Sequence, residues 1–179
     1  MIANSANQPY GFDLVAELRS QLRFCGDPAW MRNLSGLSAS ERGGLLHLAV
    51  MQQPWLNQLL KREKTIESRW SAKRMSAYRT IGRDDLIALK ESSGPVVGLA
   101  MPTEVQHVEL DCPGAWDRVR RLAGQLCVDD AFYAAQWAKG AKYVALIWIG
   151  AVLELTPFWI PKTDRHAWVV FGDGFFGDR

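Results

Sequence analysis

The chain has 179 residues, of which 48% are hydrophobic, 22% charged and 11% aromatic. This length suits one domain, or one domain with a helical appendage, and the composition argues against a disordered or fibrous protein. The net charge of +2 is too small to indicate a nucleic-acid partner by itself. The basic residues are concentrated, however, because the stretch Lys61–Lys90 holds nine of them against four acidic ones.

The N-terminal part predicts a helix followed by irregular structure. Asp13 is placed to cap a helix that ends near Cys25–Gly26, because apolar residues recur behind it at helical spacing. These apolar residues are Leu14, Val15, Leu18 and Leu22. The next segment, Asp27–Gly44, contains Gly, Ser and Pro and one short helical signal at Ser38–Glu41, so we expect an irregular covering structure. Residues 1–44 are therefore predicted to form a helical N-terminal extension.

A different pattern starts at Leu45 and predicts a strand, a short helix and a second strand. Leu45–Met51 is an apolar run with strand character, and Pro54 suits the first turn of a helix through Leu60. Thr65–Trp70 is expected to be extended, because Thr, Ile and Trp favour strands and no helical stripe continues through it. Side chains alternate along a strand, so one face of this segment is polar. That face carries Thr65, Glu67 and Arg69, and the other carries Ile66, Ser68 and Trp70.

The rest of the chain predicts short strands with two helices inserted late. The expected strands are Asp85–Leu89, Val96–Met101, Val105–Leu110, Tyr143–Leu155 and Ala167–Phe171, and the expected helices are Ala115–Leu126 and Asp130–Lys139. Asp129 is the expected cap of the second helix. Short strands crowded around a twisted sheet indicate an α+β domain with a small, partly closed β-barrel over residues 45–171. The glycine-rich residues 172–179 are expected to form a flexible tail.

Cysteine and histidine usage gives no sign of a metal, a disulfide or a cofactor. The cysteines and histidines are Cys25, Cys112, Cys127, His47, His107 and His166. They are scattered, without a C-x-x-C pair or a zinc-ligand spacing, and a reducing, cytoplasmic setting fits them best. The longest apolar run, Tyr143–Leu153, is too short to span a bilayer, and the N-terminus lacks the pattern of a secretory signal. We therefore expect no cofactor, no metal and no membrane partner.

One motif carries more information than the composition. A Q-P-W segment at 53–55, a helical turn, and then K-T-I-E-S-R at 64–69 resemble the signature of the ASCH domain, a branch of the PUA-like superfamily. The context agrees, because Leu45–Met51 stands where the family has a first strand, and Pro161–Trp168 is similar to the closing part of such domains. The resemblance covers about Leu45–Val170 and implies a PUA-like β-barrel with flanking helices and a cleft beside the motif. It also implies RNA binding in that cleft, and a few similar proteins are hydrolases of modified nucleosides or ribonucleases.

The residues around this motif support a nucleic-acid site on physical grounds. Arg69 offers a planar fork that suits a phosphate or a guanine edge, and Lys64 offers a compact positive charge. Glu67 shares a strand face with Arg69, which keeps its carboxylate ionised and able to accept from the amino group of a base. Tryptophans beside the motif are candidates for stacking on a base. The predicted nucleic-acid-binding residues are Trp55, Lys64, Thr65, Glu67, Arg69, Trp70, Lys73 and Arg74.

Other interpretations of the same residues stay open. Glu67 and Arg69 are equally able to form a structural ion pair beneath tryptophans that pack in the core. As an enzyme, the cleft would use Lys64 as base or nucleophile and Glu67 as proton shuttle, in an acylcytidine amidohydrolase-like or ribonuclease reaction. The amidohydrolases of the family have a threonine where this chain has Glu67, and Thr65 is displaced from that place by two positions. A protein-interaction module is the third interpretation.

Late aromatic residues add the idea of a cage for a modified base, because stacked ring faces accept a planar base. The alternative for those within strands is packing in the barrel core. The candidates are Trp148, Phe158, Trp159 and Trp168. The sequence thus predicts a protein that binds RNA or single-stranded nucleic acid, or a nucleoside, and it leaves the exact ligand and the oligomeric state open.

Overall fold

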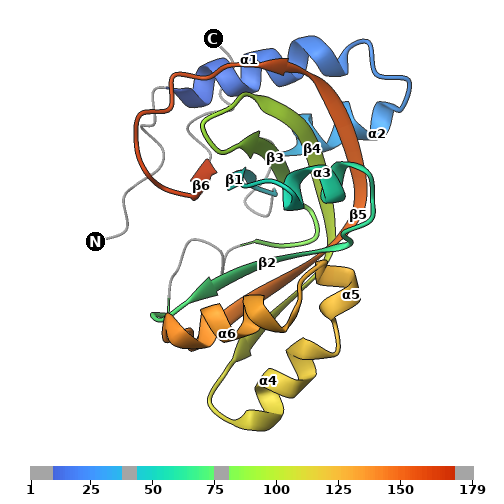
Figure 1. Ribbon diagram of the computed structural model, residues 1–179. Coiled ribbons are helices and arrows are strands. Elements are labelled where there is room, and N and C mark those ends of the chain that lie inside the picture. Colours follow the sequence, from blue (N-terminus) through green and yellow to red (C-terminus); the bar gives the residue numbers. More distant parts are fainter. Residues whose placement is uncertain (1–9, 38–43, 75–80, 172–179) are drawn as a thin grey trace.

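The computed structural model describes residues 10–37, 44–74 and 81–171, and it forms one curled sheet with helices packed around it (Figure 1). The short helical signal predicted at Ser38–Glu41 and the flexible tail predicted at 172–179 lie outside these residues. The helices are α1 (Tyr10–Leu22), α2 (Pro28–Gly36), α3 (Trp55–Leu60), α4 (Pro113–Arg120), α5 (Ala123–Leu126) and α6 (Asp130–Ala138). The strands are β1 (Leu46–Met51), β2 (Ile66–Ser71), β3 (Leu86–Glu91), β4 (Val96–Glu109), β5 (Tyr143–Phe158) and β6 (Trp168–Phe171).

The six strands form one sheet in the order β2-β5-β4-β3-β1-β6. The β1–β3 pair is parallel, and the other neighbouring strands are antiparallel. The edge strands β2 and β6 are not paired with each other, so the curled sheet is a half-barrel with an open side. The predicted α+β class and the partly closed barrel are thus confirmed.

The central strands are buried on both faces, which explains why their sequences are continuous apolar runs. Leu46 and Leu48 of β1 pack with α1 and α2 on the outer face of the sheet. Ala49 and Met51 of the same strand belong to a second cluster, which also holds Trp168 and which we call the inner cluster because it gathers side chains from five strands of the curl. A third cluster covers β2 and the first half of β5 with α4, α5 and α6. Strand β2, which carries most of the K-T-I-E-S-R motif, therefore lies between the inner cluster on one side and α6 on the other.

The N-terminal helices belong to the core cluster of the outer face. Leu14, Leu18 and Leu34 are fully buried against the sheet. The side-chain amide of Gln21 pairs with the main chain of Thr156 in β5 as the backbone of a neighbouring strand would. It donates to the Thr156 carbonyl and accepts from the Thr156 N–H, both at 2.9 Å. A domain boundary near residue 44 stays a prediction from the sequence. No helix in the described ranges has both the length and the apolar character needed to cross a membrane.

Two helix predictions are wrong, the first because a capping signal was overlooked. The segment Asp27–Gly44, expected to be irregular, contains α2, whose start is fixed by the Asp27 carboxylate accepting from Ala29 N–H at 2.8 Å and by Pro28 in the first turn. The single helix predicted at Ala115–Leu126 is divided into α4 and α5. The predicted cap of α6 is confirmed, because Asp129 accepts from the Phe132 N–H at 2.9 Å.

The strands predicted at Val96–Met101 and Val105–Leu110 are one long strand, β4. The pairing of β4 with β5 shifts register on both sides of Pro102. Proline lacks the N–H that a continuous ladder needs, so a bulge accommodates it without ending the strand. The strands predicted around 45–51, 65–70, 85–89, 143–155 and 167–171 are confirmed.

Candidate functional site

A cavity of about 450 Å³ lies beside the motif strand β2, on the open side of the half-barrel. Its wall combines the ends of β1 and β6, the helices α3 and α6, and both faces of β2, which is accessible because β2 is an edge strand. Its lining residues include Trp55, Lys64, Glu67, Arg69, Trp70 and Trp168. Five of these six residues were predicted from the sequence to bind nucleic acid, and Trp168 was a candidate for the aromatic cage.

Strand pairing explains why Glu67 and Arg69 point into the curl. Glu67 lies opposite Ile147 and Arg69 opposite Ala145 across the β2–β5 ladder. Directly opposed residues in a ladder share a face, and both partners belong to the inner cluster. Ile66 packs on the other side of β2 with α4 and α6. The alternation predicted from the sequence therefore holds, and it turns the acidic and basic side chains toward the cavity.

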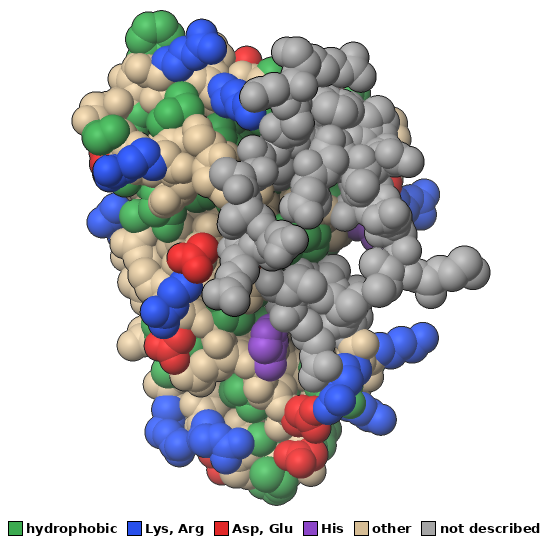
Figure 2. Space-filling view, turned by 180° about the vertical axis from the view of Figure 1, so that it is seen from behind, with side chains coloured by type: hydrophobic (Ala, Val, Ile, Leu, Met, Phe, Trp, Pro, Cys, Tyr) green, Lys and Arg blue, Asp and Glu red, His purple; other side chains and the backbone are tan. Residues whose placement is uncertain are grey.

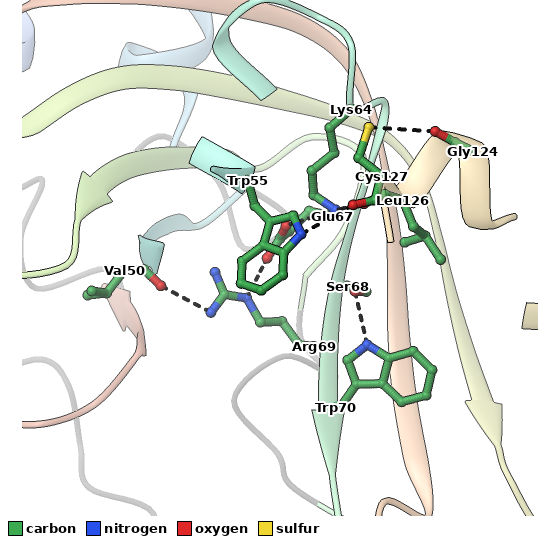
Figure 3. A network of polar contacts seen from close by, with 10 residues as sticks. All are labelled: Val50, Trp55, Lys64, Glu67, Ser68, Arg69, Trp70, Gly124, Leu126 and Cys127. Atoms are coloured by element: carbon green, nitrogen blue, oxygen red, sulfur yellow. Dashed lines mark hydrogen bonds and ion pairs between the residues drawn. The ribbon is translucent and has the colours of Figure 1, made fainter. Parts of the chain in front are cut away.

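Lys64, Glu67 and Arg69 form a charged row in this interior (Figure 3). Lys64 Nζ lies 3.6 Å from Glu67 Oε2 and donates to the Leu126 carbonyl at 2.9 Å. Both Lys64 and Glu67 are buried, with 3% and 7% of their surface exposed. Burial lowers the pKa of the Lys64 amine, and the neighbouring Glu67 carboxylate opposes this shift. The site thus contains an amine that loses its proton more readily than a surface lysine.

Arg69 is only partly satisfied by its surroundings. Its Nη1 donates to the carbonyls of Val50 at 3.3 Å and Ala167 at 3.4 Å, which lie across the open side of the sheet. Its Nε lies 3.0 Å from Glu67 Oε1, within ion-pair distance but outside hydrogen-bonding geometry. Neither Nε nor Nη2 has a hydrogen-bond acceptor among the described residues, although both atoms are shielded from solvent. The Arg69 side chain is half-buried at the cavity wall, and an acceptor in the cavity reaches its unused donors when the guanidinium turns toward it.

Trp168 supports Arg69 from below and is itself anchored by a buried chain of polar contacts. The Arg69 guanidinium carbon lies 4.8 Å from the centre of the Trp168 ring, a cation–π distance. The Trp168 indole donates to His47 Nδ1 at 3.1 Å, and His47 Nε2 lies 2.9 Å from Asp85 Oδ2. An indole N–H is only a donor, so His47 Nδ1 is unprotonated and Nε2–H donates to Asp85. In this tautomer the fully buried His47 accepts from the Trp168 indole and holds the Trp168 ring in place beside the Arg69 guanidinium.

Aromatic rings form the remaining walls. Trp55 donates its indole N–H to the Cys127 carbonyl at 3.3 Å and meets Phe132 edge to face, with the ring centres 5.7 Å apart. Trp70 lies on the side of β2 away from Arg69, donates to Ser68 Oγ at 3.0 Å and also meets Phe132. Trp55 and Trp70 are both half-buried, so each packs on the protein and keeps part of its ring surface at the cavity.

Three predicted site residues lie outside the cavity wall. Thr65 is exposed, and its backbone is engaged with Gln125 and Ile149. Lys73 and Arg74 are exposed just beyond the end of β2, where Arg74 pairs with Glu109. On the face shown in Figure 2, basic side chains lie singly or in small groups beside acidic ones. The described cavity wall carries two cations, Lys64 and Arg69, and one carboxylate, that of Glu67.

The four aromatic residues considered for a cage are not brought together. Phe158 packs against the cluster of α1 and α2, Trp148 against that of α4–α6, and Trp159 is 71% exposed. Trp168 alone of the four lines the cavity. The aromatic walls come instead from Trp55, Trp70, Phe132 and Trp168. These rings belong to α3, β2, α6 and β6, which meet at the cavity.

Several residues of this site were not predicted from the sequence. His166 lines the cavity, and its Nδ1 lies 3.0 Å from Asp164, a contact that leaves Nε2 for other partners. Phe132 and Gln136 of α6 line it as well. Their spacing of four residues places both on one helix face, a signal present in the sequence. Within the described ranges, no three side chains of His, Cys, Asp or Glu come together to hold a metal ion.

The half-barrel of six strands, with the K-T-I-E-S-R motif running into its edge strand β2, is similar in fold to a solved ASCH protein. The crystal structure of ASCH from Zymomonas mobilis superposes with a TM-score of 0.50 at 11% sequence identity, covering 63% of this chain and 71% of that chain. A serine-to-alanine mutant of the same protein gives 0.50 at 13% identity, covering 63% and 72%. No family model and no curated protein matches the sequence. The resemblance seen in the sequence is thus confirmed at the level of the fold.

The buried amine of Lys64 predicts a pH dependence of stability. An unfolded chain keeps this lysine protonated up to about pH 10.4, whereas the native state releases the proton earlier. Between these two pKa values the unfolded state binds more protons, so the contribution of Lys64 to the free energy of unfolding rises with pH. In urea titrations across the alkaline range, wild type should therefore gain stability relative to Lys64→Met. A difference that stays constant with pH would contradict the burial of a titrating amine, and other alkaline groups cancel in the comparison.

Proposed function

We propose that this protein binds one nucleotide unit of RNA or of another single-stranded nucleic acid in the cavity beside β2. The observation that carries the proposal is the Arg69 guanidinium, stacked on Trp168 in a cavity with aromatic walls and with Nε and Nη2 lacking an acceptor among the described residues. Aromatic faces accept any base by stacking, and the guanidinium adds a charged fork for a phosphate or a base edge. PUA-like folds are compatible with such a ligand, which is an analogy of fold.

The size and polarity of the cavity agree with this ligand. A volume of about 450 Å³ lies in the range of small-ligand pockets, and it is too small for a duplex. Glu67 supplies a carboxylate that is able to accept from a base amino group, although Lys64 and Arg69 also lie beside it. The exposed Lys73 and Arg74 are proposed to meet the phosphates of flanking nucleotides, outside the cavity, and Thr65 to lie along the same path.

Stacking on the cavity wall is tested by removing one ring. Trp55→Ala should weaken the binding of a short single-stranded RNA roughly tenfold, the order of one base stacked on an aromatic side chain. Fluorescence anisotropy of a labelled hexanucleotide measures the affinity. Trp159→Ala is the matched control, because Trp159 is a highly exposed tryptophan that does not line the cavity. Equal losses in both variants, or none in either, would count against the cavity as the binding site.

A second candidate function is hydrolysis in the same cavity. It is favoured by the lowered pKa of Lys64 next to Glu67, since a larger fraction of the amine is then unprotonated and available to accept a proton. The His166 imidazole, held by Asp164 at the cavity wall, is a further group able to transfer a proton. Wild type and Lys64→Met are to be incubated with N4-acylated cytidine and with RNA, and the products separated. Equal product from both proteins would remove Lys64 from any mechanism.

A further inference from the structure

Helix α6 presents one polar side chain to the cavity that neither the fold nor the charged row uses. Gln136 is half-buried and lines the cavity one helical turn after Phe132. Its main-chain carbonyl accepts from Ala141, but its side-chain amide makes no hydrogen bond to any residue in the described part of the chain. The amide is reached by solvent, so it is able to exchange water for a ligand that enters between the aromatic walls.

The backbone that carries Gln136 is firmly held. The Asp129 carboxylate caps the start of α6, and Tyr133 of the same helix is 1% exposed and donates its hydroxyl to the Val119 carbonyl at 3.3 Å. Phe132, also on this helix, meets both Trp55 and Trp70. Gln136 therefore approaches the cavity from a fixed helix, next to the rings on which a base would stack.

The chemistry of this position differs from that of the charged and aromatic lining groups. Gln52 also brings a side-chain amide to the wall, but Gln52 is exposed, whereas Gln136 is half-buried on a helix. Stacking surfaces do not distinguish one base from another, and a guanidinium or ammonium attracts any phosphate. Glu67 and Arg69 are able to contact a base edge, but they already pair with each other, and Lys64 lies beside Glu67. A side-chain amide has a donor beside an acceptor, and its bidentate partner among the bases is the N6/N7 edge of adenine. From its placement and its unused amide, we propose that Gln136 is the residue that determines base specificity, with adenine as the preferred base. This inference rests on the proposed nucleotide binding.

The experiment compares four probes on three proteins. AMP, CMP, GMP and UMP are titrated into wild type, Gln136→Met and Gln125→Met, and affinity is measured by calorimetry. Methionine keeps the length of the side chain without its hydrogen bonds. Gln125 is an exposed glutamine of α5 that does not line the cavity, so its variant is the matched control. Wild type and the control should prefer AMP roughly tenfold over UMP, the order of one bidentate base contact, and Gln136→Met should bind all four with similar affinity.

A second substitution tests the direction of the effect. Gln136→Glu replaces the amide by an acceptor that pairs with the N4 amino group of cytosine, so the preference should move from AMP toward CMP. Thermal unfolding of each variant checks that the helix is intact. If wild type binds the nucleotides and Gln136→Met keeps the same base preference, the role of Gln136 is overturned while the proposed function stands. If wild type binds none of the four, both the function and this inference are wrong.

Discussion

Arg69→Ala should weaken the binding of a short single-stranded RNA by roughly tenfold to a hundredfold, the range of one or two charge-assisted hydrogen bonds. The guanidinium has donors without an acceptor among the described residues and lies over the Trp168 ring, so it is the cationic group at the cavity wall with the most unused donors for an acidic or carbonyl oxygen. The salt dependence of binding should also flatten, because one fewer cation releases counterions from the RNA. Affinity is measured by anisotropy at several salt concentrations.

Two further variants separate the role of the fork from the role of its charge. Arg69→Lys keeps the positive charge but loses the planar donors and the stacking on Trp168, so it should recover only a small part of the affinity. Arg118→Ala removes an exposed arginine of α4 that does not line the cavity, and it should bind as wild type does. An Arg69→Ala protein that is folded and binds with unchanged affinity and salt slope would end the proposal for this cavity.

Asp85→Ala should lower the free energy of unfolding by roughly 3–5 kcal/mol, because three donors lose their acceptor at once. The buried carboxylate accepts from the backbone N–H groups of Leu45 and Gly82, both at 2.6 Å, and from His47 at 2.9 Å. Without it, the imidazole that holds Trp168 is itself unsupported. Urea denaturation followed by tryptophan fluorescence measures the change.

The neighbouring aspartate provides the control for this prediction. Asp84 is exposed and directly precedes Asp85, and Asp84→Ala should change stability by no more than about 0.5 kcal/mol. Asp85→Asn should also be destabilised, because its amide group would direct a donor toward one of the three donors that now meet the carboxylate. Asp85→Ala as stable as Asp84→Ala would show that the polar chain behind Trp168 contributes little.

The parts of the site that were predictable are those governed by local order. Alternation along β2 placed Glu67 and Arg69 on one face, and the structure turns that face toward the cavity. The motif also marked Trp55 and Trp70, which both line it. These features depend on a few consecutive residues, for which strand geometry is a strong guide.

The parts that escaped prediction depend on contacts between distant segments. His47 and Trp168 are 121 residues apart, and His47 and Asp85 are 38 apart, so no local pattern links them. The burial of Lys64 follows from its bond to the carbonyl of Leu126, on a helix that the sequence placed only approximately. Lys73 and Arg74 were grouped with the site by their closeness in sequence, but the strand carries them away from it.

The open side of the half-barrel has a mechanical consequence. In the part of the chain that the structure describes, the edge strands β2 and β6 share no ladder. The Arg69 side chain of β2 spans this opening and donates to the main-chain carbonyls of Val50 and Ala167 on the opposite edge. The Arg69 guanidinium, which is proposed to bind the ligand, therefore also connects the two edges of the opening. An acceptor that binds Nε or Nη2 pulls on the same guanidinium whose Nη1 spans the opening, so we expect ligand binding to change the separation of the two sheet edges.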